Sequence, residues 1–241
     1  MIGLSDSVAF PTTNGNGLWT VKSMPRNWQD LVSGLSDVNK LVHLSMRQDS
    51  ADTENIRSSL VKARRREYES ELNSLAKSAG CSRSAMVSEG ETLNEINDLS
   101  KQQADSMVNT YNYDLGIALI AIRTETPTAN RHTYARRLAE WDKNRAVWKN
   151  AQVATDTVLN SKSLAQRDFM RFNTNVESTA TLAGPNPAAE PICQGWLDRG
   201  KVPAQTAINN PSPFHANCPH PWEFTPKKLD KGECDSLWMG G

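Results

Sequence analysis

The sequence lacks a charge excess, a long apolar run and a dense set of cysteines. Its 27 basic and 27 acidic residues cancel, so a protein that coats nucleic acid over its whole surface is excluded and any DNA contact must be local. Mean hydropathy is -0.58, and no apolar run approaches the roughly 18 residues of a membrane span. The opening Met1-Ile2-Gly3-Leu4 lacks the basic and apolar segments of a signal peptide. We therefore expect a soluble protein made in the cytosol.

The four cysteines stand at positions 81, 193, 218 and 234. They are too few and too scattered for a disulfide framework, and a reducing compartment would keep them as thiols. Cys81 and Cys234 are expected to be isolated, small, apolar side chains. Three of the four fall in the last 49 residues, which indicates a local cluster there.

Residues 1–30 are rich in Gly, Asn, Thr and Pro and show no sustained helical or strand periodicity. This composition predicts an N-terminal arm. Trp19 and Trp28 interrupt it, and aromatic anchors in such an arm often dock to a partner. Packing of both tryptophans on the protein's own helices is the equally open alternative.

Residues 31–176 predict a helical domain of three or four long helices. The stretch Thr53 to Ala79 reads as one helix, with Gly80 as its C-terminal stop. A second follows the turn around Gly90, because its apolar residues recur at spacings of three and four. These residues are Leu93, Ile96, Met107, Tyr111, Leu115, Ala118 and Ile122. The Arg64-Arg65-Arg66 run is expected to form a solvated face with the glutamates that follow it.

The third helix is predicted from about Pro127 to Phe172, with Thr126 as its N-cap. Trp141 and Trp148 lie seven residues apart on one face, which indicates bundle core, a subunit interface or a docking surface for a partner. This helix is locally basic. The candidates for a DNA contact are Arg131, Arg136, Arg137 and Arg145, with a plain solvated face as the alternative.

Residues 177–241 hold nine of the twelve prolines, so a long helix is excluded and short strands and turns are expected. Together the patterns predict a mainly α fold, in which long helices precede a small irregular or β-containing C-terminal module. The proposed divisions are an arm at 1–30, a helical domain at 31–176 and a Pro-rich module at 177–241.

The order of motifs in the second half resembles the Mu F-like family of phage minor head proteins. The matching motifs are Arg123-Thr124-Glu125, Trp141 or Trp148, Cys193 with Gly200-Lys201, and Pro213-Phe214-His215-Ala216-Asn217-Cys218. They cover residues 115–222, and Trp196 and His220 stand where the family has further cysteines. The resemblance implies a non-enzymatic virion protein that is present in multiple copies and associated with the portal and major capsid proteins, with packaged DNA as a further candidate partner. Its location would be the virion head, and the host cytoplasm during assembly.

The C-terminal module has two possible stabilising arrangements. Cys193, His215, Cys218 and His220 offer two thiolates and two imidazoles, a tetrahedral set suited to zinc. A metal-free knot is the alternative, held by hydrogen bonds with Phe214 and Trp222 packed inside. No cofactor is otherwise expected.

Catalytic motifs do not stand out in the sequence, which has no phosphate-binding glycine loop and no His-Glu-x-x-His. Glu125 is expected to pair with an arginine within its own helix or in a buried site. Three functions remain open at this point: a structural minor head protein that assists head assembly or DNA delivery, a head-to-tail connector ring, and a zinc-stabilised DNA-binding module.

Overall fold

The computed structural model describes residues 51–82, 90–184, 190–214, 218 and 220–237. Within these residues, three long helices come first, and a three-stranded antiparallel sheet with three short helices follows. The expected mainly α fold with a small β-containing C-terminal module is confirmed. The arm at 1–30, with Trp19 and Trp28, lies outside the described residues.

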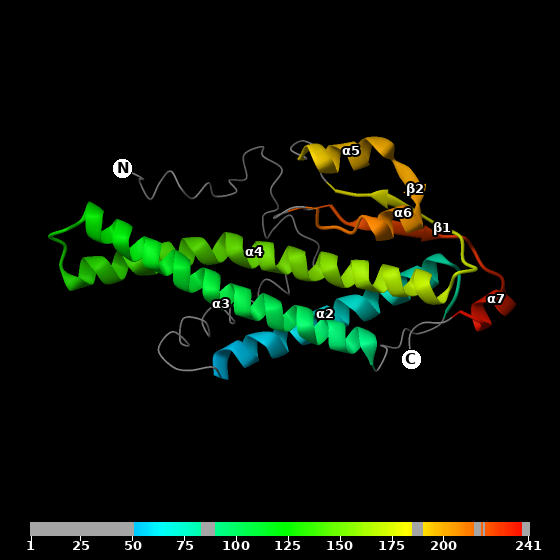
Figure 1. The fold of residues 1–241 in the computed structure, drawn as a ribbon, viewed down its shortest axis with the longest axis horizontal. Helices are drawn as coiled ribbons and strands as arrows, with labels where there is room; N and C mark the ends of the chain where they lie inside the picture. Colours follow the sequence, from blue (N-terminus) through cyan, green and yellow to red (C-terminus); the bar gives the residue numbers. More distant parts are fainter. Residues whose placement is uncertain (1–50, 83–89, 185–189, 215–217, 219, 238–241) are drawn as a thin grey trace.

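The long helices are α2 (Ala51–Ser78), α3 (Glu91–Glu125) and α4 (Arg131–Phe172). They have 28, 35 and 42 residues, so α3 and α4 exceed α2 in length by about 10 and 20 Å at 1.5 Å per residue. Figure 1 shows α3 and α4 joined as a hairpin that reaches past the start of α2. In the described part of the chain, no helix is long and apolar enough to cross a membrane.

The helix boundaries agree with the sequence pattern except at the α3–α4 turn. Gly80, with φ of 90°, ends the first long helix as expected. Thr126 marks the predicted boundary but caps the C-terminus of α3, its amide donating to the carbonyl of Ile122. The N-cap of α4 is Asn130, whose side chain accepts from the amide of Thr133 at 3.0 Å. The predicted N-cap at Thr126 is therefore wrong, because the chain makes a short turn after Pro127 before the next helix begins.

Two apolar clusters fill the molecule. The first, which we call the central core, lies within the helices and includes Ile56, Leu60 and Val158. The second, the basal core, joins the other end of the helices to the C-terminal module and includes Tyr68, Phe169 and Trp222. Of the stripe predicted on α3, Ile96, Tyr111, Ala118 and Ile122 are buried. The module and the helices therefore share one core.

The C-terminal module consists of β1 (Ser178–Leu182), α5 (Pro191–Arg199), β2 (Lys201–Pro203), α6 (Ala204–Asn209), β3 (Trp222–Pro226) and α7 (Lys231–Asp235). The strand order is β2-β1-β3, with β1 in the middle. Ala180 pairs with Val202 on one side and with Phe224 on the other. Burial alternates along β3, so Trp222 and Phe224 face the basal core.

A disulfide joins Cys81, just after α2, to Cys234 in α7. The expectation that these two cysteines are isolated thiols is therefore wrong. They stand 153 residues apart in sequence, and they meet because the segment before α7 returns to the end of α2, where the amide of Leu229 donates to the carbonyl of Ala79 at 2.9 Å.

Candidate functional site

Three of the four predicted metal ligands meet in the C-terminal module. Cys193 lies in the first turn of α5, and Cys218 and His220 lie in the segment before β3. All three side chains are buried, with the two sulfur atoms 3.6 Å apart. The ligand atoms of the three lie within 4.8 Å of one another. His215, the fourth predicted ligand, lies outside the described residues.

The Cys193 and Cys218 sulfur atoms are not joined by a disulfide and contact each other. Burial, followed by the neighbouring Cys218, raises the pKa of Cys193 to about 12. Without a cation beside it, this side chain therefore stays a neutral thiol at physiological pH. A bound divalent cation reverses that balance, because it stabilises the thiolate directly.

Hydrogen bonds from α4 hold the segment that carries Cys218 and His220. The hydroxyl of Ser163 donates to the carbonyl of Ser212 at 2.9 Å, and the hydroxyl of Ser212 donates to the carbonyl of His220. Gln166 donates to the carbonyl of Trp222 at 2.9 Å. These contacts tie the backbone at His220 and Trp222 to a long helix, so the His220 side chain sits on a rigid support.

An aromatic cluster closes the other side of this region. Trp196, Phe214 and Trp222 lie with ring centroids 5.5 to 6.3 Å apart, within the range of favourable aromatic pairs. Arg199 stacks over Trp196 at 4.2 Å. The expected packing of Phe214 and Trp222 inside the module is confirmed.

The basic residues of α4 are divided between exposed positions and ion pairs. Arg145 is 7% exposed, donates to Asp114 at 2.9 Å and stacks over Tyr111 at 4.8 Å. A guanidinium so enclosed is not placed to contact DNA. Arg137 pairs with Glu125 at 3.0 Å across the α3–α4 turn, so the partner expected for Glu125 lies in the next helix and the pair is partly exposed. Arg136 is exposed.

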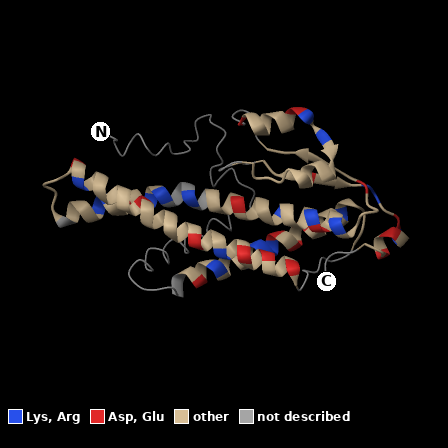
Figure 2. Cartoon of the chain, in the orientation of Figure 1, with Lys and Arg blue, Asp and Glu red and all other residues tan. Residues whose placement is uncertain are grey.

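The tryptophans of α4 are only partly described. Trp141 is half-buried and packs against Tyr111 at a centroid distance of 5.9 Å, so it serves the helix interface more than a partner. The side chains of Trp148 and Arg131 lie outside the described part of the structure. Figure 2 shows Asp and Glu positions among the Lys and Arg positions along α4. This mixture of charges gives little support to a continuous DNA-binding stripe on the helix.

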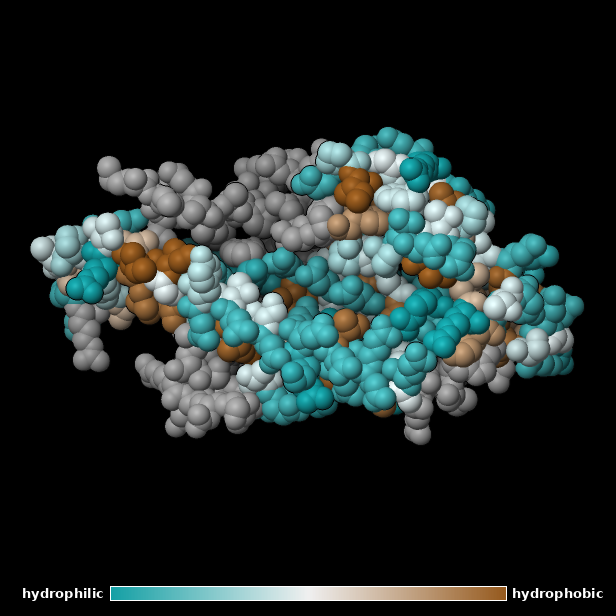
Figure 3. All heavy atoms as spheres, viewed as in Figure 1, coloured by the Kyte–Doolittle hydropathy of each residue, from teal (hydrophilic) through white to brown (hydrophobic). Residues whose placement is uncertain are grey.

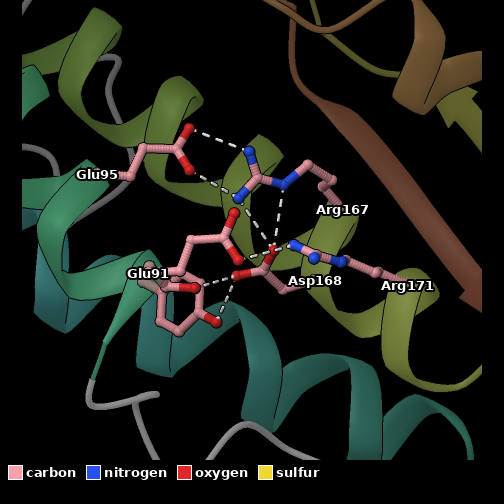
Figure 4. A network of polar contacts seen from close by, with 7 residues as sticks. Glu91, Glu95, Arg167, Asp168 and Arg171 are labelled. Atoms are coloured by element: carbon pink, nitrogen blue, oxygen red, sulfur yellow. Dashed lines mark hydrogen bonds and ion pairs between the residues drawn. The ribbon is translucent and has the colours of Figure 1, made fainter.

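A buried carboxylate on α4 was not predicted from the sequence. Asp168 is 1% exposed and accepts hydrogen bonds from the hydroxyls of Tyr68 at 2.9 Å and Thr92 at 2.8 Å. Its other oxygen accepts from Arg167, which also forms a bidentate pair with Glu95 at 3.0 and 2.8 Å. Figure 4 shows this network with the Glu91 and Arg171 pair beside it. Burial, followed by Asp168, raises the pKa of Tyr68 above its ordinary value. The network locks α2, α3 and α4 together.

Charged residues also lie inside the bundle. Arg64 is 2% exposed and donates to Gln103 at 2.6 Å, so the expected solvated face of the arginine run holds for Arg65 and Arg66 but is wrong for Arg64.

A cavity of about 120 Å³ lies between α3 and α4, and Gln103, Arg145, Lys149 and Asp156 are among its lining residues. Burial raises the pKa of Asp156 to about 6, opposed by Arg64 and Lys149. The lining of this cavity mixes these polar residues with Met107, Tyr111 and Val153, and the polar groups offer hydrogen-bond partners for water.

The part of α3 near the hairpin turn exposes large apolar side chains. Tyr113, Ile117 and Ile120 are 71%, 50% and 69% exposed. Together with Gly116 they occupy one face, which we call the outer α3 face, opposite the buried Tyr111, Ala118 and Ile122. Figure 3 shows an apolar patch at this end of the molecule. The signal for it was present in the sequence as apolar residues on both sides of one helix.

Comparisons with known proteins leave the family of this chain open. No family model, no curated protein and no solved structure matches it.

Proposed function

We propose that this chain is a non-enzymatic minor head protein of a tailed bacteriophage, which packs against the portal protein and assists head assembly or DNA delivery. Support comes from two sources: the family resemblance of its C-terminal motifs and the outer α3 face. The face is the observation that carries the proposal, since a contiguous exposed apolar surface is typical of a protein contact.

The outer α3 face suits docking of a helix. Tyr113, Ile117 and Ile120 recur at spacings of four and three, so they form a stripe about two turns long. Gly116 lies within it, and a Cβ atom built there meets no described atom within 4 Å. A second helix could therefore approach the backbone closely at this point. The stripe carries no charge, so its partner surface on the portal protein is expected to be apolar as well.

A catalytic role has little support from the side chains that come closest to one. Cys193, Cys218 and His220 combine thiols with an imidazole, but their exposed fractions are 0%, 0% and 1%. A substrate could not reach them without opening the module. The DNA-binding alternative loses support because Arg145 and Arg137 are engaged in ion pairs.

The test is co-expression of the full chain with the portal and major capsid proteins of the same phage, followed by isolation of particles. The unaltered chain should co-purify with the portal protein. The double variant Ile117→Ser/Ile120→Ser should reduce the recovered chain at least about tenfold, since each buried isoleucine contributes roughly 1.5–3 kcal/mol at an interface. Ile192→Ser is the matched control, because Ile192 is also 50% exposed but lies on α5.

A second pair of variants separates docking from folding. Gly116→Leu fills the open space on the outer α3 face and improves helix propensity, so it should leave stability unchanged or higher while reducing recovery with the portal protein. Gly195→Leu is the control, because Gly195 lies on α5 with equally open space. The proposal would be overturned by a chain that never enters particles, and also by one whose recovery is unchanged by both Ile117→Ser/Ile120→Ser and Gly116→Leu.

A further inference from the structure

The geometry points to a structural zinc site formed by the Cys193 and Cys218 thiolates and the His220 imidazole. Its role is to clamp α5 to the segment before β3. The inference is independent of the proposed function in the phage head, because it concerns only how the C-terminal module is held closed.

The spacing of the sulfur atoms favours a metal. Two thiolates about 2.3 Å from a tetrahedral zinc ion stand about 3.8 Å apart, and the Cys193 and Cys218 sulfur atoms are 3.6 Å apart. The other pair of cysteines in this chain, Cys81 and Cys234, is joined covalently. Two thiols held near the edge length of a zinc tetrahedron, with an imidazole in reach, match the ligand chemistry that zinc prefers.

The position of the cluster in the fold gives the metal a structural task. Cys193 lies in the first turn of α5, which follows β1, whereas Cys218 and His220 come 25 and 27 residues later and lead into β3. No strand pairing joins α5 to that later segment among the described residues. A shared ion would cross-link the two segments where the backbone does not.

The support around the cluster suits a closed site. Ser212 holds the carbonyl of His220, and Ser163 of α4 holds the carbonyl of Ser212 at 2.9 Å. Such outer contacts orient ligands before the metal binds. Because the three side chains are buried, the ion would be shielded from solvent on the sides that they form. They supply three of the four ligands that a structural zinc ion takes.

The test uses the full chain, reduced and stripped of metal with a chelator, then titrated with Co²⁺ and with Zn²⁺. Cobalt should give thiolate charge-transfer absorbance and tetrahedral d–d bands at about one equivalent, and zinc should remove both. Cys193→Ser and Cys218→Ser should abolish the thiolate bands, and His220→Ala should weaken binding at least about tenfold. The double variant Cys81→Ser/Cys234→Ser is the matched control and should bind as the unaltered chain does.

A second measurement uses the unaltered chain, so that its result does not depend on whether the variants fold. Zinc should protect Cys193 and Cys218 of the unaltered chain from alkylation, with the labelled peptides located by mass spectrometry. Absence of cobalt bands in the reduced, folded chain would overturn the inference. So would formation of a Cys193–Cys218 disulfide at the same rate with and without zinc.

Discussion

The two ends of the helical bundle differ in how far their side chains are buried and paired. At the basal end, α2, α3 and α4 pack with the sheet around Phe169, a disulfide closes the edge, and Asp168 has hydroxyl donors from two helices. At the other end, α3 and α4 continue without α2 and leave Ile117 and Ile120 exposed. We call this part, residues 112–125 and 131–142, the distal hairpin.

The difference follows from helix length and has a functional meaning. Where three helices meet, each apolar stripe finds a partner, but two helices alone cannot cover apolar residues on both sides of α3. The basal end therefore carries the stability of the fold, and the distal hairpin is free to carry a contact with another protein. Substitutions in the two regions should separate these roles.

The largest effect is expected in the basal core. Phe169 is fully buried, so Phe169→Ala should lower the free energy of unfolding by about 3–5 kcal/mol, from lost burial and the cavity left behind. Ile120→Ala on the distal hairpin is the contrast and should change it by less than about 0.5 kcal/mol. Urea unfolding followed by circular dichroism measures both. Equal losses at the two positions would erase the proposed division of roles.

The disulfide gives the second largest effect. Replacing both Cys81 and Cys234 by Ser releases a closed loop of more than 150 residues, and the expected loss is about 2–4 kcal/mol. Unfolding is measured with chelator present throughout, so that a metal at the other cysteines does not contribute. Ile192→Ser serves as a surface control. If the double variant unfolds at the same urea concentration as the unaltered chain, the link contributes nothing to the basal end.

These two residues also show where sequence reasoning fails. Helices can be predicted because their signals are local: Gly80 ends α2, and the apolar stripe of α3 repeats within a few turns. The Cys81–Cys234 pair has no local signal, since only the return of the chain after β3 brings the two together. For the same reason Arg64 was expected to be solvated, although Gln103 of α3 covers it.

The candidate metal site could be predicted from the sequence only in part. Residue types predicted Cys193, His215, Cys218 and His220 as a ligand set, and the structure brings three of them together, while His215 lies outside the described residues. Their approach depends on α5 folding back over the segment before β3, which no periodicity in a Pro-rich sequence could indicate. The outer α3 face was missed because the buried stripe of the same helix dominated its pattern.

A smaller effect is expected from a single hydroxyl at the basal end. Tyr68→Phe removes one donor to the buried Asp168 carboxylate, and a buried carboxylate that loses a donor should cost about 1–3 kcal/mol. Tyr113→Phe, on the distal hairpin, is the matched control because Tyr113 is 71% exposed; it should be neutral. Chemical unfolding of the two variants in parallel gives the answer. A loss that is no greater for Tyr68→Phe than for Tyr113→Phe would show that Thr92 and Arg167 satisfy Asp168 without Tyr68.

The smallest effect is expected between the two ends, at Asp156 beside the polar cavity. Burial raises the pKa of its carboxyl to about 6 in the folded chain, against an ordinary value of 3.8. Arg64, whose own pKa burial lowers to about 10, and Lys149 oppose this rise. The folded state therefore binds more protons than the unfolded state between about pH 4 and pH 6.

The sign follows from linkage: the stability that Asp156 contributes is fully present below about pH 4 and is lost as the pH rises through about 6. Asp156→Asn has no titrating carboxyl there, so the difference in unfolding free energy between the two proteins should drift by about 1–2 kcal/mol over this interval and stay constant from pH 7 to 8. Denaturant unfolding at half-unit pH steps measures it. A constant difference from pH 4 to 8 would mean that Arg64 and Lys149 keep the carboxylate ionised, and the middle of the bundle would then hold a permanent buried ion pair.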